Sequence, residues 1–199
     1  VAALIGGGLV ALSAGPAQAE PATTVAYSGG STATLYQGLA FDTCSAPPLS
    51  TIQAWAASPY RAVGVYFGGP NRACMQPNLT AGWVQAVTGL RWRLVPIYMG
   101  LQAPCYTGPK TRITPSQAAA QGTASATDAV TAAGALGMLR GSALYADMEN
   151  YDGTNVACRN AVLQYLSAMT KELHRIRPGV GGLGHMAVQY ARAMGLNVI

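Results

Sequence analysis

The chain has 199 residues, half of them hydrophobic and a tenth charged, and its formal net charge is +5. This length and composition fit one domain with a hydrophobic core and exclude a disordered chain. The 12 Lys and Arg residues are scattered and form no basic stripe, so nucleic acid is not an expected partner. A solvated surface explains the positive charge better than an affinity for anionic wall polymers does.

The first 37 residues are expected to lie outside the folded domain. Residues 1–12 are an apolar run and Ala17-Gln18-Ala19 is a small-x-small motif, which together are typical of a secretory signal cleaved before Glu20. The apolar run is too short to span a membrane. We predict a signal peptide at 1–19, a flexible leader at 20–37, and secretion to the cell wall or medium without stable membrane insertion after cleavage.

Four short apolar runs between residues 38 and 177 are typical of strands, and segments of helical periodicity separate them. We predict strands that end at Asp42, Phe67, Met99 and Glu149. Pro96 inside the third run indicates a bulge or a locally unpaired edge. Such alternation indicates parallel strands joined by right-handed crossovers. The predicted fold class is α/β, a (β/α) TIM-type barrel truncated to about four β/α units and followed by an unrelated C-terminal helix.

The segments between these runs predict four helices. Residues 49–55 have a short amphipathic stripe, and Asn78 is a suitable N-cap for a second helix. A Thr-Pro start predicts a third helix over 114–136, which is Ala-rich and weakly amphipathic. Apolar residues at helical spacing over 162–173 predict a fourth helix packed on the core.

The four cysteines, Cys44, Cys74, Cys105 and Cys158, all follow predicted strand ends. An even number in a secreted protein predicts two disulfides. They form no CxxC pair and the two histidines lie far from them in the sequence, so no metal site is expected. Three pairings are possible, and the neighbouring loops of a (β/α) barrel favour Cys44–Cys74 and Cys105–Cys158.

The run from Gly141 to Gly153 combines a short apolar stretch with closely spaced acids. In an extended chain Tyr145, Asp147 and Glu149 share one face. Two neighbouring carboxylates repel each other, and partial burial raises the pKa of one, as a general acid needs. Glycoside hydrolysis uses one protonated carboxyl and one carboxylate, so this pair predicts a glycosidase site.

Each acid has an expected role. Glu149, at the strand end, is the candidate proton donor, and Asp147 and Asp42 are expected to position groups or to stabilise charge. The predicted substrate contacts are Tyr98, Gln102, Tyr145 and Tyr151. The alternative is structural, with the acids satisfying Arg72 or loop amides.

Several motifs in the same order resemble one family: Phe41-Asp42-Thr43-Cys44, residues 58–66, Gly100-Leu101-Gln102-Ala103-Pro104-Cys105, and Tyr145-Ala146-Asp147-Met148-Glu149. It is the actinobacterial secreted family of glycoside-hydrolase-like domains of unknown function, related to lysozyme-type (family 25) barrels. The resemblance covers about residues 38–177. It implies a TIM-type barrel, peptidoglycan or another cell-wall glycan as substrate, and an acidic pocket built from Asp42, Asp147 and Glu149.

The segment 178–199 departs from this pattern. Gly179, Gly181 and Gly184 fit G-x-G-x-x-G, and the stretch resembles the nucleotide-binding turn of zinc-dependent, cinnamyl-type alcohol dehydrogenases. That fingerprint needs a strand before it and an acid about 20 residues after it. A basic helix end precedes it here and the sequence stops at Ile199. No cofactor is therefore predicted, and the segment is interpreted as a fusion or a sequence artefact.

Three functions follow in order of preference. The first is a secreted glycoside hydrolase that acts on peptidoglycan or another wall glycan by carboxylate acid/base catalysis. The second is a non-catalytic glycan-binding domain, inactive because it is truncated. The third, supported only by 178–199, is a fragment of an NAD(P)-dependent alcohol dehydrogenase. The expected partner is cell-wall polysaccharide, and the sequence predicts no particular oligomeric state.

Overall fold

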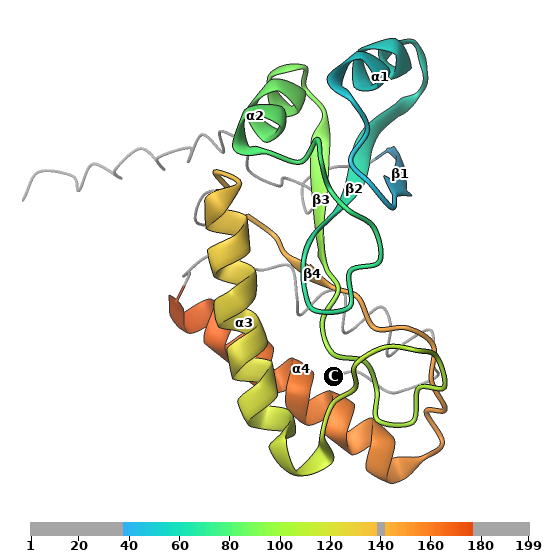
Figure 1. The fold of residues 1–199 in the computed structure, drawn as a ribbon, viewed down its shortest axis with the longest axis vertical. Coiled ribbons are helices and arrows are strands. Elements are labelled where there is room, and N and C mark those ends of the chain that lie inside the picture. The colour runs from blue at the N-terminus through green and yellow to red at the C-terminus, as the bar shows by residue number, and fades with distance from the viewer. Residues whose placement is uncertain (1–37, 139–141, 177–199) are drawn as a thin grey trace, which may run out of the picture.

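The computed structural model describes residues 38–138 and 142–176, and its centre is a parallel sheet (Figure 1). The strands are β1 (Leu39–Thr43), β2 (Tyr60–Gly68), β3 (Arg93–Tyr98) and β4 (Tyr145–Ala146). They pair in the order β1-β2-β3-β4, and every pair is parallel. The predicted signal peptide (1–19), leader (20–37) and dehydrogenase-like segment (178–199) lie outside the described residues.

Helices alternate with these strands along the chain. They are α1 (Leu49–Ala54) with the 3-10 turn η2 (Trp55–Ala57), α2 (Ala81–Gly89), α3 (Ala118–Ala135) preceded by η3 (Pro115–Gln117), and α4 (Val156–Ile176). The predicted α/β class and the four successive β/α units are confirmed. The described strands form an open sheet, because β1 and β4 are its two edges and do not pair with each other.

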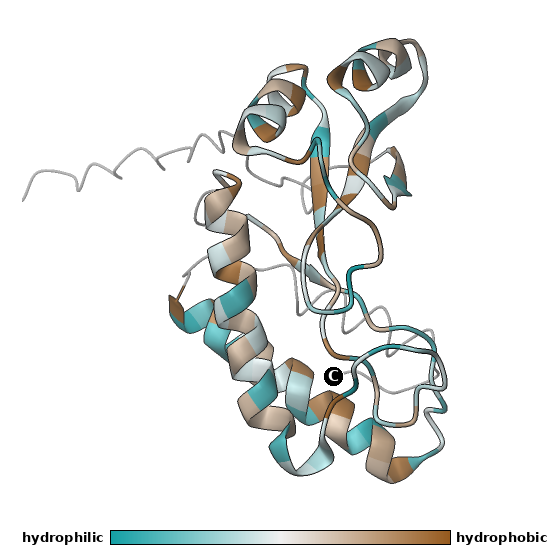
Figure 2. Cartoon of the chain, in the orientation of Figure 1, coloured by the Kyte–Doolittle hydropathy of each residue, from teal (hydrophilic) through white to brown (hydrophobic). Residues whose placement is uncertain are grey.

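The core forms where alternate side chains of the sheet meet the helices. Val63, Val65 and Phe67 of β2 are buried on one face, as the two-residue period of a strand requires. Beside them Phe41 of β1 packs on Trp55 and Trp92, with ring centroids 4.7 and 6.0 Å apart. Figure 2 shows β3 as hydrophobic along most of its length, which fits a strand with neighbours on both sides.

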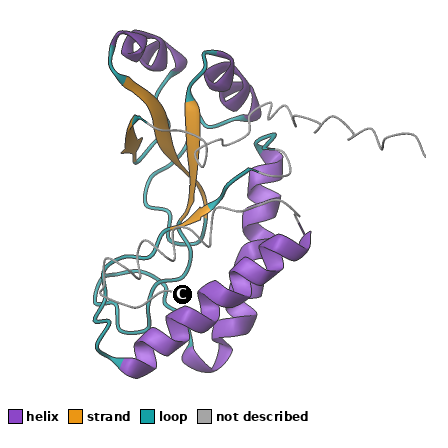
Figure 3. Ribbon diagram, turned by 180° about the vertical axis from the view of Figure 1, so that it is seen from behind, coloured by secondary structure: helices purple, strands orange, loops and turns teal. Residues whose placement is uncertain are grey.

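The two long helices α3 and α4 lie side by side, toward the carboxyl ends of the strands (Figures 1 and 3). Gly122 of α3 permits their close approach, because a Cβ atom there would overlap the main-chain oxygen of Tyr165 on α4. Tyr165, Met169 and Leu173 are each at most 1% exposed, so the predicted apolar face of the fourth helix is confirmed.

The second helix begins later than predicted. Its N-cap is Thr80, whose Oγ1 accepts a hydrogen bond from Trp83 N at 3.1 Å. The prediction of Asn78 as N-cap is therefore wrong. Asn78 instead donates through Nδ2 to Ala46 O, 32 residues earlier, at 2.9 Å. Asn is common both at caps and in loop contacts, and only the tertiary structure separates the two uses.

The third strand has the partial pairing that its proline suggested. Pro96 pairs with Val65 of β2, whereas β4 pairs only with Ile97 and Tyr98. The side of β3 that faces β4 is therefore unpaired at Pro96, as predicted. A proline without an N–H fits there at no cost in ladder hydrogen bonds.

Both predicted disulfides are present, Cys44–Cys74 and Cys105–Cys158. The first joins the loop after β1 to the loop after β2, and the second joins the loop after β3 to the first turns of α4. Two disulfides are consistent with a secreted protein. Over the described part of the chain, none of the helices combines the length and the apolar character that crossing a membrane requires.

Candidate active site

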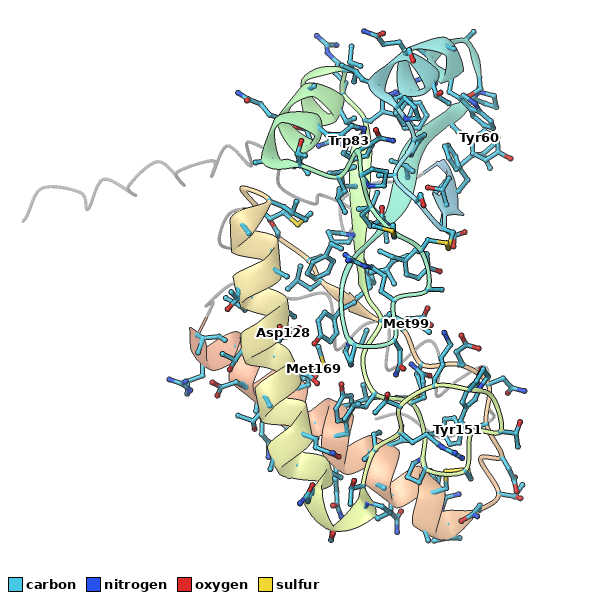
Figure 4. The ribbon with its side chains drawn as sticks, in the orientation of Figure 1. Tyr60, Trp83, Met99, Asp128, Tyr151 and Met169 are labelled. Carbon is cyan, nitrogen blue, oxygen red and sulfur yellow. A yellow bond between two sulfur atoms is a disulfide. The ribbon has the colours of Figure 1, made fainter. Side chains whose placement is uncertain are left out.

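Asp147 and Glu149 line one small cavity at the carboxyl edge of the sheet, which we call the acid cavity. Its volume is about 160 Å³. The other lining residues come from β2 and from the loops after β1, β2 and β3: Cys44, Tyr66, Asn71, Arg72, Ala73, Cys74, Met99 and Lys110. In Figure 4, Met99 marks this end of β3, and Tyr60 and Trp83 mark the opposite end of the sheet. The acids thus occupy the edge where parallel α/β sheets carry their ligands.

Gln102 holds the acid-bearing segment in place. Its side chain is fully buried, its Nε2 donates to Asp147 O at 3.0 Å, and its Oε1 accepts from Glu149 N at 2.6 Å. Asp147 N also donates to Tyr98 O at 3.0 Å. The predicted fourth strand is therefore shorter than expected. It pairs only over Tyr145–Ala146, and beyond that an amide side chain takes the place of a partner strand.

Glu149 is surrounded by groups that bind a carboxylate. Lys110 Nζ lies 3.5 Å from Oε1, and Tyr106 donates its hydroxyl to Oε2 at 3.0 Å. The hydroxyl and the ammonium group are both hydrogen-bond donors toward this carboxylate. Both partners come from the long loop between β3 and α3, so this loop fixes the position of Glu149.

Asp147 has the opposite electrostatic environment. Burial raises the pKa of its carboxyl, the charge of Glu149 raises it further, and Asp42 adds to the effect, while Lys110 opposes it. Within residues 38–138 and 142–176, the hydrogen bonds of Asp147 involve its main-chain atoms and not its carboxylate oxygens. Asp147 is therefore the member of the pair that holds a proton more readily than an ordinary aspartate.

Asp42 lies on β1, outside the lining of the acid cavity, and contacts Tyr66, which lines it. Tyr66 donates its hydroxyl to Asp42 Oδ2 at 3.1 Å, and burial together with this bond raises the pKa of Tyr66 to about 12. Asp42 is opposite Gly64 of β2, where a Cβ atom would approach the Asp42 Cβ to 2.7 Å. A side chain at position 64 would therefore displace this third acid.

Asn71 links the loops that form the walls of the cavity. Its Nδ2 donates to both Gly100 O and Thr111 O at 2.8 Å, and its Oδ1 accepts from Thr111 N at 2.8 Å. Lys110 Nζ lies 3.4 Å from Asn71 O. One asparagine thus connects the exits of β2 and β3 to the loop that carries Lys110.

The predicted substrate contacts lie in different places. Tyr98 is 1% exposed and donates to Asp128 Oδ2 at 2.7 Å, outside the acid cavity, and Gln102 is the buried amide described above. We assign both an internal role. Tyr145 is half-buried on β4 and Tyr151 is 9% exposed, and neither lines the acid cavity. Their contact with glycan stays a prediction.

Sequence reasoning missed Tyr66, Tyr106 and Lys110. Tyr66 had a usable signal, because it lies two residues beyond Gly64 on the same face of β2 as the site. Lys110 and Tyr106 had none, since their loop reaches Glu149 across about forty residues of sequence. For metals, the described ranges 38–138 and 142–176 contain no group of three His, Cys, Asp or Glu side chains placed to hold an ion.

Replacing Gln102 by Leu is expected to lower the free energy of unfolding by roughly 3 kcal/mol, because partly buried backbone groups at residues 147 and 149 lose their partner. Urea denaturation measures this loss. Gln85→Leu, on an exposed position of α2, is the matched control and is expected to leave stability within about 0.5 kcal/mol of wild type. Equal stability of the two variants would contradict the positioning role.

The raised pKa of Asp147 predicts a specific pH dependence of stability. In the unfolded chain Asp147 loses its proton near the ordinary value of 3.8, whereas the folded protein retains it to higher pH. The stabilisation is therefore complete below the unfolded pKa and is lost as pH rises through the folded pKa. Asp147→Asn lacks this loss, so its unfolding free energy relative to wild type is expected to increase from acidic to neutral pH. A difference that is constant with pH contradicts this.

Comparison with known proteins gives one match. The family model described as "Rv2525c-like, glycoside hydrolase-like domain" matches residues 53–197, which includes most of 178–199. Neither the curated proteins nor the solved structures contain a significant match. The family match covers well over half of the chain, three of the four strands, both disulfide-bonded loops after β2 and β3, and the acid pair. The chain belongs to the Rv2525c-like, glycoside hydrolase-like domain family.

Proposed function

We propose that this protein is a secreted glycoside hydrolase that cleaves peptidoglycan or another cell-wall glycan. The observation that carries the proposal is the electrostatic contrast inside the acid cavity. Asp147 has a raised pKa, and Glu149 beside it is paired with Lys110 and Tyr106. Cleavage of a glycosidic bond requires one protonated carboxyl group and one carboxylate.

The roles follow from these environments. We assign the proton donor to Asp147, in place of Glu149 as the sequence suggested. Asp147 transfers its proton to the glycosidic oxygen as the bond to the anomeric carbon breaks. The Glu149 carboxylate stabilises the positive charge that develops on the sugar ring and accepts a proton from the attacking water. Asp42, held by Tyr66, adds negative potential behind the site.

Secretion and a barrel architecture are part of the same proposal. The disulfides fit an oxidising compartment, and the apolar N-terminal run supplies a signal sequence. The four parallel strands with their site at the carboxyl edge match the arrangement of a (β/α) barrel, so we propose that the sheet is part of one.

A non-catalytic glycan-binding domain is the second candidate. The observation in its favour is that Glu149 already has a cation and a hydroxyl donor within the protein. Such contacts also serve a purely structural acid. The small volume of the acid cavity, about 160 Å³, adds to this reading, because it is less than pockets that enclose a sugar ring and its neighbours.

Purified peptidoglycan distinguishes the two candidates. The full chain is incubated with the insoluble wall, and both the protein bound to the pellet and the reducing ends released to the supernatant are measured. Release of reducing ends in proportion to enzyme and time is the expected result. Saturable binding without any release would instead establish the binding domain.

A further inference from the structure

A second and larger cavity lies between α3 and the ends of β2 and β3, and we call it the α3 cleft. Its volume is about 640 Å³. It is lined by Phe67, Gly68, Gly69, Pro70, Arg72, Tyr98, Leu101, Gln121, Ala124, Ser125, Asp128 and Ala132. This size is within the usual range for pockets that bind small molecules. Neither the acid pair nor Asp42 lines it.

The sequence of α3 explains why the cleft exists. Ala124, Asp128 and Ala132 are four residues apart and share one helix face, with Ser125 beside them. Three of these four side chains are too small to fill the space between the helix and the sheet. Ala132 still touches the end of β2, since its Cβ lies 3.3 Å from where a Cβ on Gly68 would be. The Ala-rich character of α3 therefore leaves a cleft without separating the helix from the sheet.

Asp128 provides a fixed negative group on the wall formed by α3. Tyr98 donates its hydroxyl to Asp128 Oδ2 at 2.7 Å, and Tyr165 donates to Ser125 Oγ at 2.8 Å beneath it. Figure 4 shows Asp128 on α3, at the level of the end of β3 that Met99 marks. Oδ2 accepts the hydrogen bond from Tyr98, and within the described residues Oδ1 accepts none.

Arg72 provides a positive group from the loop after β2. Its Nη1 donates to Phe67 O at 3.3 Å, and this is the one hydrogen bond of its side chain within the described residues. The remaining donors of the guanidinium keep the geometry that binds a carboxylate in a bidentate way. Among the described residues that line the α3 cleft, Arg72 is the one cation and Asp128 the one anion.

We propose that the α3 cleft binds a short peptide with free ends, its carboxylate at Arg72 and its ammonium at Asp128. A polyanion such as a nucleotide would be repelled by Asp128 and would find a single cation, Arg72. A simple cation would be repelled by Arg72. A zwitterion satisfies both groups. Phe67, Leu101 and Ala132 supply the apolar surface for small aliphatic side chains.

The two cavities share one residue, because Arg72 lines both. A peptide held in the α3 cleft therefore lies next to the place where we propose that glycan is cut. Resting on the proposed function, this arrangement points to a free peptide held beside the glycan, because a peptide joined to glycan through its amino or carboxyl end would lack one of the two charges. Peptide binding itself requires no turnover, so it is measured separately from hydrolysis.

Trialanine is the probe, titrated into the full chain by calorimetry, with N-acetyl-trialanine and trialanine amide as the two blocked forms. Trialanine is expected to bind saturably with a dissociation constant below roughly 10 mM. Each blocked form is expected to bind about tenfold or more weakly, because it loses one charge-assisted hydrogen bond. Arg72→Gln is expected to weaken the binding of trialanine about tenfold and to leave the binding of trialanine amide, which has no carboxylate, unchanged. Asp128→Asn is likewise expected to weaken the binding of trialanine about tenfold and to leave that of N-acetyl-trialanine, which has no ammonium group, unchanged.

Lys171→Gln, an exposed position on α4, removes the same charge as Arg72→Gln and is expected to bind like wild type. The proposal is overturned if wild type shows no saturable binding, or if all three peptides bind equally. If Asp128→Asn fails to fold, the acetylated peptide on wild type decides the same point. Asp147→Asn is expected to bind trialanine normally, so loss of hydrolysis and loss of peptide binding are distinguishable.

Discussion

Asparagine in place of Asp147 is expected to lower the rate of glycan release by about 10²–10⁴-fold, the usual contribution of a general acid. The amide has the size of the carboxyl group but has no proton to transfer to the leaving oxygen. The backbone contacts of residue 147 with Gln102 and Tyr98 do not involve the side chain, so the local fold is retained. The measurement is kcat and KM for release of reducing ends, and KM is expected to change little.

Two further variants serve as comparisons for Asp147→Asn. Glu149→Gln is also expected to lose activity, because it removes the carboxylate that faces the developing charge, while Glu172→Gln on α4 is the matched control and keeps the wild-type rate. The outcome that would reverse the assignment is full activity of Asp147→Asn together with inactive Glu149→Gln. Glu149 would then be the proton donor, as the sequence alone suggested.

Removing the Cys105–Cys158 disulfide is expected to lower the free energy of unfolding by roughly 4 kcal/mol. The crosslink closes a segment with a sequence separation of 53 residues, so it restricts the unfolded chain strongly. The variant is Cys105→Ala with Cys158→Ala, and urea denaturation of oxidised proteins measures the difference.

The other disulfide is the natural comparison. Cys44 and Cys74 line the acid cavity and are 30 residues apart, so their replacement is expected to affect activity more and stability slightly less. Unchanged stability of the Cys105→Ala/Cys158→Ala protein would show that the long loop is held by its other contacts alone, such as those of Asn71.

Much of the fold was predictable because its signals are local. Each signal is contained within ten or twenty residues: the apolar strand runs, the helical periodicities and the cysteines after strand ends. The alternation of strands and helices then strongly restricts the possible topologies. That topology favoured both disulfide pairings among the three that were possible. The position of Asp147 and Glu149 at the carboxyl edge followed as well, since it depends only on where the apolar run stops.

The finer structure of the site was not predictable, because it depends on contacts between distant loops. Gln102 was predicted to contact substrate at a strand end, yet it is buried and satisfies backbone groups 45 and 47 residues away. That contact ends β4 early. Lys110 lies in a loop without periodicity, so no pattern indicates that it reaches Glu149. The raised pKa of Asp147 likewise depends on burial and on the charge of Glu149 in the folded protein.

The Cys105–Cys158 crosslink has a consequence for a chain that is cut. The segment between the two cysteines contains Lys110, α3, Asp147 and Glu149. Hydrolysis of a single peptide bond anywhere in this segment leaves both pieces covalently joined. A protein exposed to extracellular proteases therefore retains both walls of its acid cavity in one molecule after such a nick. The two fragments separate on a denaturing gel only after a reductant is added.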